Sequence, residues 1–131
     1  MKILLDTNVL IAAFVARGVC ADLLEHCIER HQVFTSEFIL NEFARKLVGK
    51  FHRESEDATA ATELLRTRLI VVTYAPLGFK VCRDSDDDDI LAAAVSGKCD
   101  CLVTGDKDLL VLREFRSCRI LSPSDFLRVE S

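Results

Sequence analysis

Two aspartates follow short apolar runs, in the position that a buried strand gives to a side chain at its end. Asp6 comes directly after the apolar residues 3–5, and Asp106 closes the segment 101–106, which begins Cys-Leu-Val. In open α/β sheets, active sites lie at the carboxyl ends of the strands. The two carboxylates are therefore expected together at that edge of a sheet.

Carboxylates that share one cleft repel each other and resist removal from water. A hard divalent cation such as Mg²⁺ or Mn²⁺ offsets their charge, because oxygen ligands suit these ions. Such an ion lowers the pKa of a water molecule so that it attacks phosphate as hydroxide, and a second ion often stabilises the leaving oxygen. The two strand ends therefore indicate metal-assisted chemistry on phosphate, with one or two ions.

Length and composition favour one domain over residues 1–131. Half of the residues are hydrophobic, and the chain has only two prolines and five glycines, so that no linker or repeat is expected. No apolar run approaches the roughly 20 residues of a membrane-spanning helix, and the first residues lack the pattern of a signal peptide. We expect a cytoplasmic protein.

The charge of the chain argues against binding nucleic acid through bulk positive charge, because the formal net charge is −4 and the pI is about 5.4. Much of the negative excess comes from residues 84–89, Asp-Ser-Asp-Asp-Asp-Asp, where a bound metal ion would offset part of it. A nuclease is therefore still compatible with the sequence. Its candidate phosphate contacts are Arg17, Arg45, Lys46, Lys50, Arg53 and Lys107.

The cysteines and histidines indicate no metal site or catalytic triad of their own. The six cysteines lie in apolar or helical patterns, and the only close pair is Cys99 and Cys101, so we expect reduced thiols and no structural zinc. His26, His31 and His52 are isolated in the sequence. A serine hydrolase or a P-loop ATPase would need a Gly-x-Ser-x-Gly or a Walker motif, and the chain has neither.

Apolar patterns with the periods of strands and helices alternate along the chain. Strands are predicted over residues 2–5, 33–35, 70–73, 101–103 and 119–121, and helices over about 8–15, 21–30, 37–51, 55–66, 87–96 and 107–112, with a last turn or helix after Pro123. This alternation is typical of an α/β domain with a largely parallel sheet.

Four acidic segments, in this order, resemble the PIN-domain family. They are Leu-Asp-Thr-Asn-Val-Leu at 5–10, Glu42 in a central helix, Asp-Asp-Asp-Asp-Ile-Leu-Ala-Ala-Ala at 86–94, and Thr-Gly-Asp-Lys-Asp-Leu at 104–109. The resemblance covers essentially the whole chain. Within the family it is to the VapC-like group of small single-domain toxins from toxin–antitoxin systems.

This resemblance implies a three-layer α/β/α sandwich whose acidic cleft binds Mg²⁺ or Mn²⁺ and cleaves RNA. Its catalytic metal ligands would be Asp6, Glu42, Asp88 and Asp106, with Asn8, Thr104 and Asp108 lining the same site. Asp88 fits because Leu91 and Ala92 follow it at the third and fourth positions, whereas Asp86 and Asp87 are alternatives. The family's toxins commonly form homodimers and bind a small antitoxin, so both partners are expected here.

Other interpretations of the same residues remain open at this point. Asp6 and Asp106 are good helix caps, and Glu42 with Lys46 has the spacing of a surface ion pair. A haloacid-dehalogenase-like phosphatase would need a second aspartate where Asn8 stands. A catalytically silent PIN module that binds RNA or a protein is the main alternative, and it would not shorten RNA.

Overall fold

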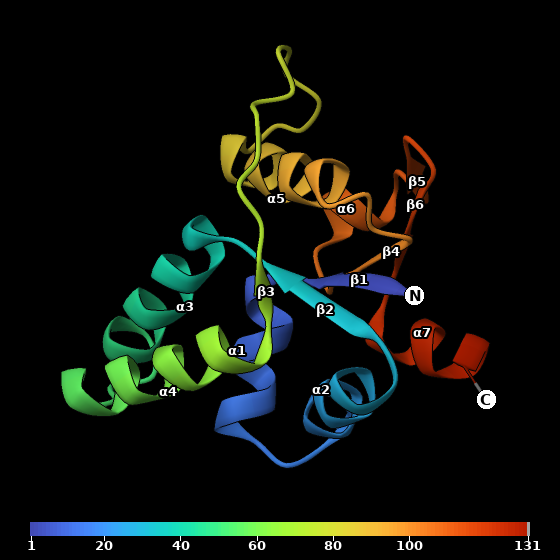
Figure 1. Ribbon diagram of the computed structural model, residues 1–131. Coiled ribbons are helices and arrows are strands. Elements are labelled where there is room, and N and C mark those ends of the chain that lie inside the picture. The colour runs from blue at the N-terminus through green and yellow to red at the C-terminus, as the bar shows by residue number, and fades with distance from the viewer. Residues whose placement is uncertain (131) are drawn as a thin grey trace.

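The chain forms one sheet with helices on both faces, as the computed structural model shows for the described residues, 1–130 (Figure 1). The strands are β1 Lys2–Leu5, β2 Gln32–Thr35, β3 Ile70–Val71, β4 Cys101–Val103, β5 Glu114–Phe115 and β6 Cys118–Leu121. The helices are α1 Thr7–Val15, α2 Val19–Arg30, α3 Glu37–Gly49, α4 Ser55–Arg68, α5 Ser85–Ser96, α6 Lys107–Leu110 and α7 Pro123–Glu130.

The strands lie in the order β3-β2-β1-β4-β6-β5, and only β5 and β6 pair antiparallel. In Figure 1, α5 and α6 lie on one face of the sheet, whereas α1, α2 and α7 lie on the other, with α3 and α4 beside α1. The predicted α/β/α sandwich with a largely parallel sheet is confirmed.

The core explains why β1 occupies the centre of the sheet. Its residues Ile3, Leu4 and Leu5 are fully buried, as is Leu102 in the neighbouring β4. A parallel strand covered on both faces needs such a continuous apolar run instead of an alternating one. The register pairs Leu5 with Val103, so that the chain leaves β1 and β4 at the same edge of the sheet.

Several element boundaries differ from the prediction. The helix α5 begins at Ser85 because Asp84 caps it and accepts a hydrogen bond from the Asp86 backbone N–H at 2.9 Å. The strand β3 is confined to Ile70–Val71, and β5, which the sequence pattern did not predict, is a two-residue partner of β6. Strands this short carry too little periodicity to be predicted from sequence.

The cysteines are free thiols, as expected, and all but Cys20 are buried. Across residues 1–130, no single helix is both long and apolar enough to cross a membrane, although α1 and α2 together meet that test as a pair bent by 110°.

Candidate functional site

The carboxyl ends of β1 and β4 bring Asp6 and Asp106 to one cleft, as their positions after apolar runs predicted. The Asp6 backbone N–H donates to the Val103 carbonyl at 3.0 Å, which joins the two strand ends directly. We call the hollow beside them the acidic cleft. It has a volume of about 220 Å³ and is lined by Asp6, Asn8, Glu42, Arg45, Lys46, Asp84, Asp86, Asp87, Ile90 and Asp106.

Thr104 holds the two strand-end aspartates in place. Its hydroxyl donates to Asp6 Oδ2 at 2.6 Å and accepts from the Asp106 backbone N–H at 3.0 Å. The other oxygen of Asp6 accepts from the Thr7 N–H at 2.7 Å. Asp6 and Thr104 are both buried, so the position of the Asp6 carboxylate is fixed by protein contacts on both oxygens.

Asp106 is both a helix cap and a member of the acidic group. Its Oδ1 accepts from the Asp108 N–H at 2.8 Å at the start of α6. Asp108 in turn accepts from the Arg83 guanidinium at 2.8 and 3.0 Å. One carboxylate oxygen from each of Asp87, Asp106 and Asp108 lies within 4.8 Å of the others. Asp106 therefore caps α6 and also belongs to the group of clustered carboxylates, so the two interpretations of this residue are compatible.

Glu42 and Asn8 reach the acidic cleft from α3 and α1. Glu42 is 9% exposed, which is low for a glutamate, and its nearest cation is Arg45 at 3.9 Å. Lys46 instead donates to Asn8 Oδ1 at 3.2 Å. The structure thus contains no Glu42–Lys46 ion pair among the described contacts, and both Arg45 and Lys46 line the cleft.

The structure puts Asp87, and not Asp88, in the acidic cleft. Asp88 accepts hydrogen bonds from the backbone N–H groups of Val81 at 3.1 Å and Cys82 at 2.8 Å, so its carboxylate anchors the loop before α5. Asp87 begins the buried stripe of α5 that continues with Ile90, Leu91 and Ala94. Because consecutive helical residues point about 100° apart, the two neighbouring carboxylates face different surroundings.

Burial and like charge raise the pKa values of Asp6 and Asp87 in the acidic cleft. Burial is the main cause for Asp6, and the charges of Glu42 and Asp106 add to it, although hydrogen bonds from Thr104 and Thr7 act in the opposite direction. The pKa of Asp87 rises to about 7, through burial and then through the Asp106 charge. The acidic cleft therefore favours a bound proton or cation.

This donor set fits a hard divalent cation. All of its close ligand atoms are carboxylate oxygens, the type that Mg²⁺ and Mn²⁺ prefer. The nearby cations are Arg45 and Lys46 at one side and Arg83 on Asp108. Among residues 1–130, Asp6, Asp87 and Asp106 form no ion pair of their own. Arg83 was not singled out from the sequence, because its spacing from Asp108 carries no recognisable signal.

Comparison with known proteins gives a family and a fold. The family pattern described as PIN domain matches residues 2–108. The uncharacterized protein MJ1680 of Methanocaldococcus jannaschii is 32% identical over 124 residues, which cover 87% of this chain and 76% of that protein.

Solved structures share the fold at low sequence identity. VapBC2 from Rickettsia felis, bound to a DNA fragment from its promoter, gives a TM-score of 0.68 at 14% identity and covers 93% of this chain and 98% of that chain. VapBC-1 from nontypeable Haemophilus influenzae gives 0.67 at 19% identity, covering 95% and 99%. FitAcB from Neisseria gonorrhoeae gives 0.57 at 16% identity, covering 93% and 98%. The chain belongs to the PIN-domain family, and its fold is similar to that of the VapBC proteins.

Proposed function

We propose that this protein is a metal-dependent endoribonuclease and the toxin of a toxin–antitoxin pair, acting as one domain over residues 1–131 in the cytoplasm, where its RNA substrate is found. PIN domains are generally nucleases. The single observation that carries the proposal is the convergence of Asp6, Glu42, Asp87 and Asp106 on one cleft from four separate elements. A surface ion-pair network would distribute opposite charges instead.

The proposed metal ligands are Asp6, Asp87 and Asp106, and Glu42, which lines the same cleft, is a further candidate. Asp87 takes the role that the family resemblance implied for Asp88, because Asp87 lines the cleft and lies close to Asp106, whereas Asp88 anchors the loop before α5 and does not line the cleft. Asp108 supports Asp106 through its backbone N–H. A bound Mg²⁺ or Mn²⁺ would supply an activated water for attack on the phosphodiester and would offset negative charge at the scissile phosphate.

Other side chains of this site orient the carboxylates and attract the RNA phosphates. Thr104 links the Asp6 carboxylate to the Asp106 backbone, which fixes the Asp6 carboxylate relative to the end of β4. Lys46 holds Asn8 at the rim. Arg45, exposed beside Glu42, offers a cation to the phosphate of an approaching strand. These contacts would make cleavage weaker at high salt.

An antitoxin partner and a homodimer belong to the same proposal. The supporting observation is an apolar hollow of about 430 Å³ between α1, α2 and α4, whose wall includes Phe14, Leu24, Ile28 and Leu64. Leu64 is 51% exposed. Large apolar side chains left open to water are typical of surfaces that bind another protein. The alternative function is a catalytically silent PIN module that binds RNA or a protein partner.

The decisive experiment is cleavage of a mixed single-stranded RNA pool by the purified protein with Mn²⁺, Mg²⁺ or EDTA. Asp6→Asn is the test variant, because it removes the charge and keeps the size of the side chain. Arg66→Gln, on the exposed α3–α4 surface outside the acidic cleft, is the matched control. We expect metal-dependent cleavage by the wild type and by the control, and no cleavage by Asp6→Asn.

Equal cleavage by Asp6→Asn and the wild type would overturn the proposed site. RNA binding without shorter products, in every metal, would favour the silent module instead. Sedimentation of the wild-type protein as a monomer at all concentrations would remove the homodimer from the proposal without affecting the nuclease.

A further inference from the structure

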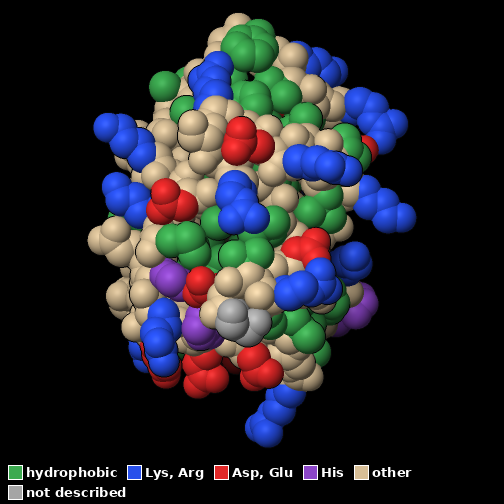
Figure 2. All heavy atoms as spheres, turned by 90° about the vertical axis from the view of Figure 1, so that its right-hand side faces the viewer, with side chains coloured by type: hydrophobic (Ala, Val, Ile, Leu, Met, Phe, Trp, Pro, Cys, Tyr) green, Lys and Arg blue, Asp and Glu red, His purple; other side chains and the backbone are tan. Residues whose placement is uncertain are grey.

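Two histidines and a glutamate meet at the edge of the sheet opposite the acidic cleft. His26 lies in α2, His31 follows that helix directly, and Glu130 ends α7. His26 Nε2 is 3.0 Å from Glu130 Oε1, and His31 Nε2 contacts the same oxygen. Histidine and acidic side chains gather on the lower part of the face in Figure 2. The fold thus joins residues that stand about 100 positions apart and that look isolated in the sequence.

The surrounding structure orients this group, which we call the His-Glu cluster. The His31 ring packs edge-on against Phe126 of α7, with ring centroids 6.3 Å apart, and Phe126 is fully buried. The Met1 amino nitrogen lies 3.1 Å from His31 Nδ1, so that both ring nitrogens have a partner. The imidazole of His31 is therefore held by the core and by α7.

The cluster is also open on one side. The side chains of His26, His31 and Glu130 are 34%, 12% and 18% exposed. A small ion and its water molecules can reach ligands with this exposure, while the apolar core behind them limits how far the side chains can move. Cys27, the buried residue that follows His26, is not part of the cluster, whose mutually close ligand atoms come from His26, His31 and Glu130.

The donor chemistry differs from that of the acidic cleft. The cluster offers two imidazole nitrogens and a carboxylate oxygen, all within 4.8 Å of one another. Two histidines and a glutamate with a fourth position for water form a common zinc-binding set. Two ligands on one tetrahedral zinc ion lie roughly 3.4 Å apart, so the direct contacts of both histidines with Glu130 Oε1 would have to lengthen slightly to admit the ion.

We propose that His26, His31 and Glu130 form a second metal site, selective for Zn²⁺ over Mg²⁺, which fastens α7 to α2. Imidazole ligands favour zinc, whereas the oxygen-only acidic cleft favours Mg²⁺ or Mn²⁺. The two helices already pack against each other, so the ion adds a link across an existing contact. The His-Glu cluster shares no residue with the acidic cleft, and this proposal does not depend on the proposed nuclease activity.

The test is zinc uptake by the full chain, purified without a polyhistidine tag, stripped of metal and kept in excess Mg²⁺. We expect the wild type to hold one more zinc ion per chain than His26→Gln, with affinity lowered at least ~10-fold in the variant. Zn²⁺ should also raise the thermal unfolding midpoint of the wild type, because a ligand of the folded state stabilises it. Co²⁺ should give the intense visible absorption of a four-coordinate site.

The matched control is His52→Asn, which removes the remaining histidine. His52 is exposed and has a φ of 54°, a conformation that asparagine tolerates. The His52→Asn variant should bind as much zinc as the wild type. His26→Gln is the decisive variant because the His26 side chain is the most exposed of the three and the substitution suits a helix.

Equal zinc uptake by His26→Gln and His52→Asn overturns the proposal. So does a wild-type unfolding midpoint that Zn²⁺ leaves unchanged. If Glu130→Gln lowers the midpoint of the metal-free protein while Zn²⁺ has no effect on the wild type, the cluster is an ion-pair contact only. None of these outcomes alters the RNA cleavage result, so the two proposals fail independently.

Discussion

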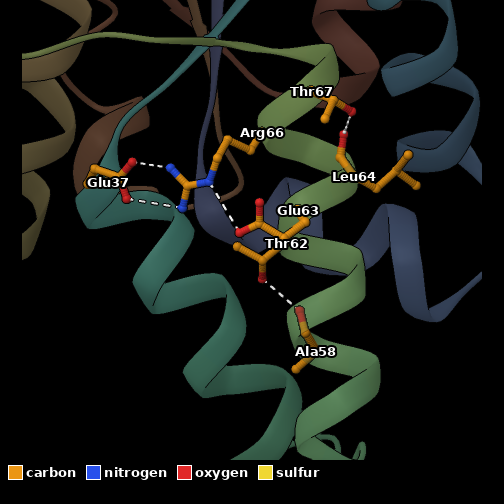
Figure 3. A network of polar contacts seen from close by, with 7 residues as sticks. All are labelled: Glu37, Ala58, Thr62, Glu63, Leu64, Arg66 and Thr67. Carbon is orange, nitrogen blue, oxygen red and sulfur yellow. Dashed lines mark hydrogen bonds and ion pairs between the residues drawn. The ribbon is translucent and has the colours of Figure 1, made fainter.

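Carboxylates have opposite surroundings in two regions of this molecule. On the surface of α3 and α4, Glu37 and Glu63 share the guanidinium of Arg66, with contacts of 3.2 Å from Nη2 to Glu37 Oε2 and 3.3 Å from Nε to Glu63 Oε1 (Figure 3). In the acidic cleft, burial and the charge of neighbouring carboxylates instead raise the pKa values of Asp6 and Asp87. The first region balances its charge, and the second accumulates it.

This difference distinguishes charges that stabilise the fold from charges that serve a function. The pKa of Arg66 is raised by its glutamate partners, so the ionised forms support each other. Burial of Asp87 beside Asp106 disfavours ionisation and works against the folded state when both are charged. Such an unfavourable burial of charge is typical of functional sites, where a bound cation or a reaction requires the carboxylates. The contrast predicts that substitutions in the two regions affect different properties.

The largest effect is expected from Asp106→Asn. This substitution removes one charge from the cleft but keeps the side-chain oxygen that caps α6. Cleavage of RNA with Mg²⁺ should fall by roughly 100-fold or more, since a proposed metal ligand is weakened. The metal-free protein should stay folded. Full activity with unchanged Mg²⁺ dependence would show that the clustered charge has no catalytic role.

The neighbouring residues Asp87 and Asp88 allow a functional and a structural carboxylate to be compared within a single turn of α5. Asp87→Asn should lower RNA cleavage strongly, though by less than Asp106→Asn, with little loss of stability. Asp88→Asn should retain most of the activity but lower the free energy of unfolding by about 1–3 kcal/mol, because an amide cannot accept both backbone N–H groups of Val81 and Cys82. Urea unfolding and RNA cleavage, measured on both variants, test this assignment of roles. The reverse assignment of the two effects would return the proposed ligand role to Asp88.

A third prediction concerns pH. The pKa of Asp87 rises from 3.8 to about 7 on folding, so the folded protein holds this proton more tightly than the unfolded chain. The contribution of Asp87 to stability is therefore present below about pH 4 and is lost as the pH rises towards 7. In EDTA, the unfolding midpoint of the wild type should fall over this range relative to that of Asp87→Asn. A constant difference between the two proteins would contradict the prediction.

Magnesium provides the control for that pH profile. If the cleft binds the ion through ionised carboxylates, added Mg²⁺ should stabilise the wild type more at pH 8 than at pH 5. Asp87→Asn should show a smaller difference between the two pH values. Stabilisation that is independent of pH would place the ion elsewhere on the protein.

Local sequence was sufficient to predict the positions of Asp6 and Asp106. Each stands at the end of an apolar run, and the parallel register of β1 and β4 puts both ends at one edge. Asp87 and Asp88 needed the phase of α5, which depends on where the helix begins. The signal available in the sequence was the spacing of Asp87 from Ile90, Leu91 and Ala94, the residues that share its buried stripe.

Tertiary contacts explain what the sequence could not predict. Lys46 has the spacing to pair with Glu42, but it bonds to Asn8, 38 positions away, since α3 packs against α1. Arg83 meets Asp108 only because the loop before α5 returns beside α6. The His-Glu cluster likewise depends on α7 docking on α2. Spacing within one element carries no information about such partners.

The smallest effect is expected from Arg66→Gln, on the balanced side of the comparison. Arg66 is an exposed donor to two exposed glutamates (Figure 3), and ion pairs in water contribute little because solvent and salt screen them. RNA cleavage should equal that of the wild type, and the unfolding midpoint should shift less than in Asp88→Asn. Repeating the unfolding in high salt should remove most of the remaining shift. A loss of cleavage in this variant would mean that the α3–α4 surface takes part in binding RNA, and charge balance would then no longer distinguish the structural region from the functional one.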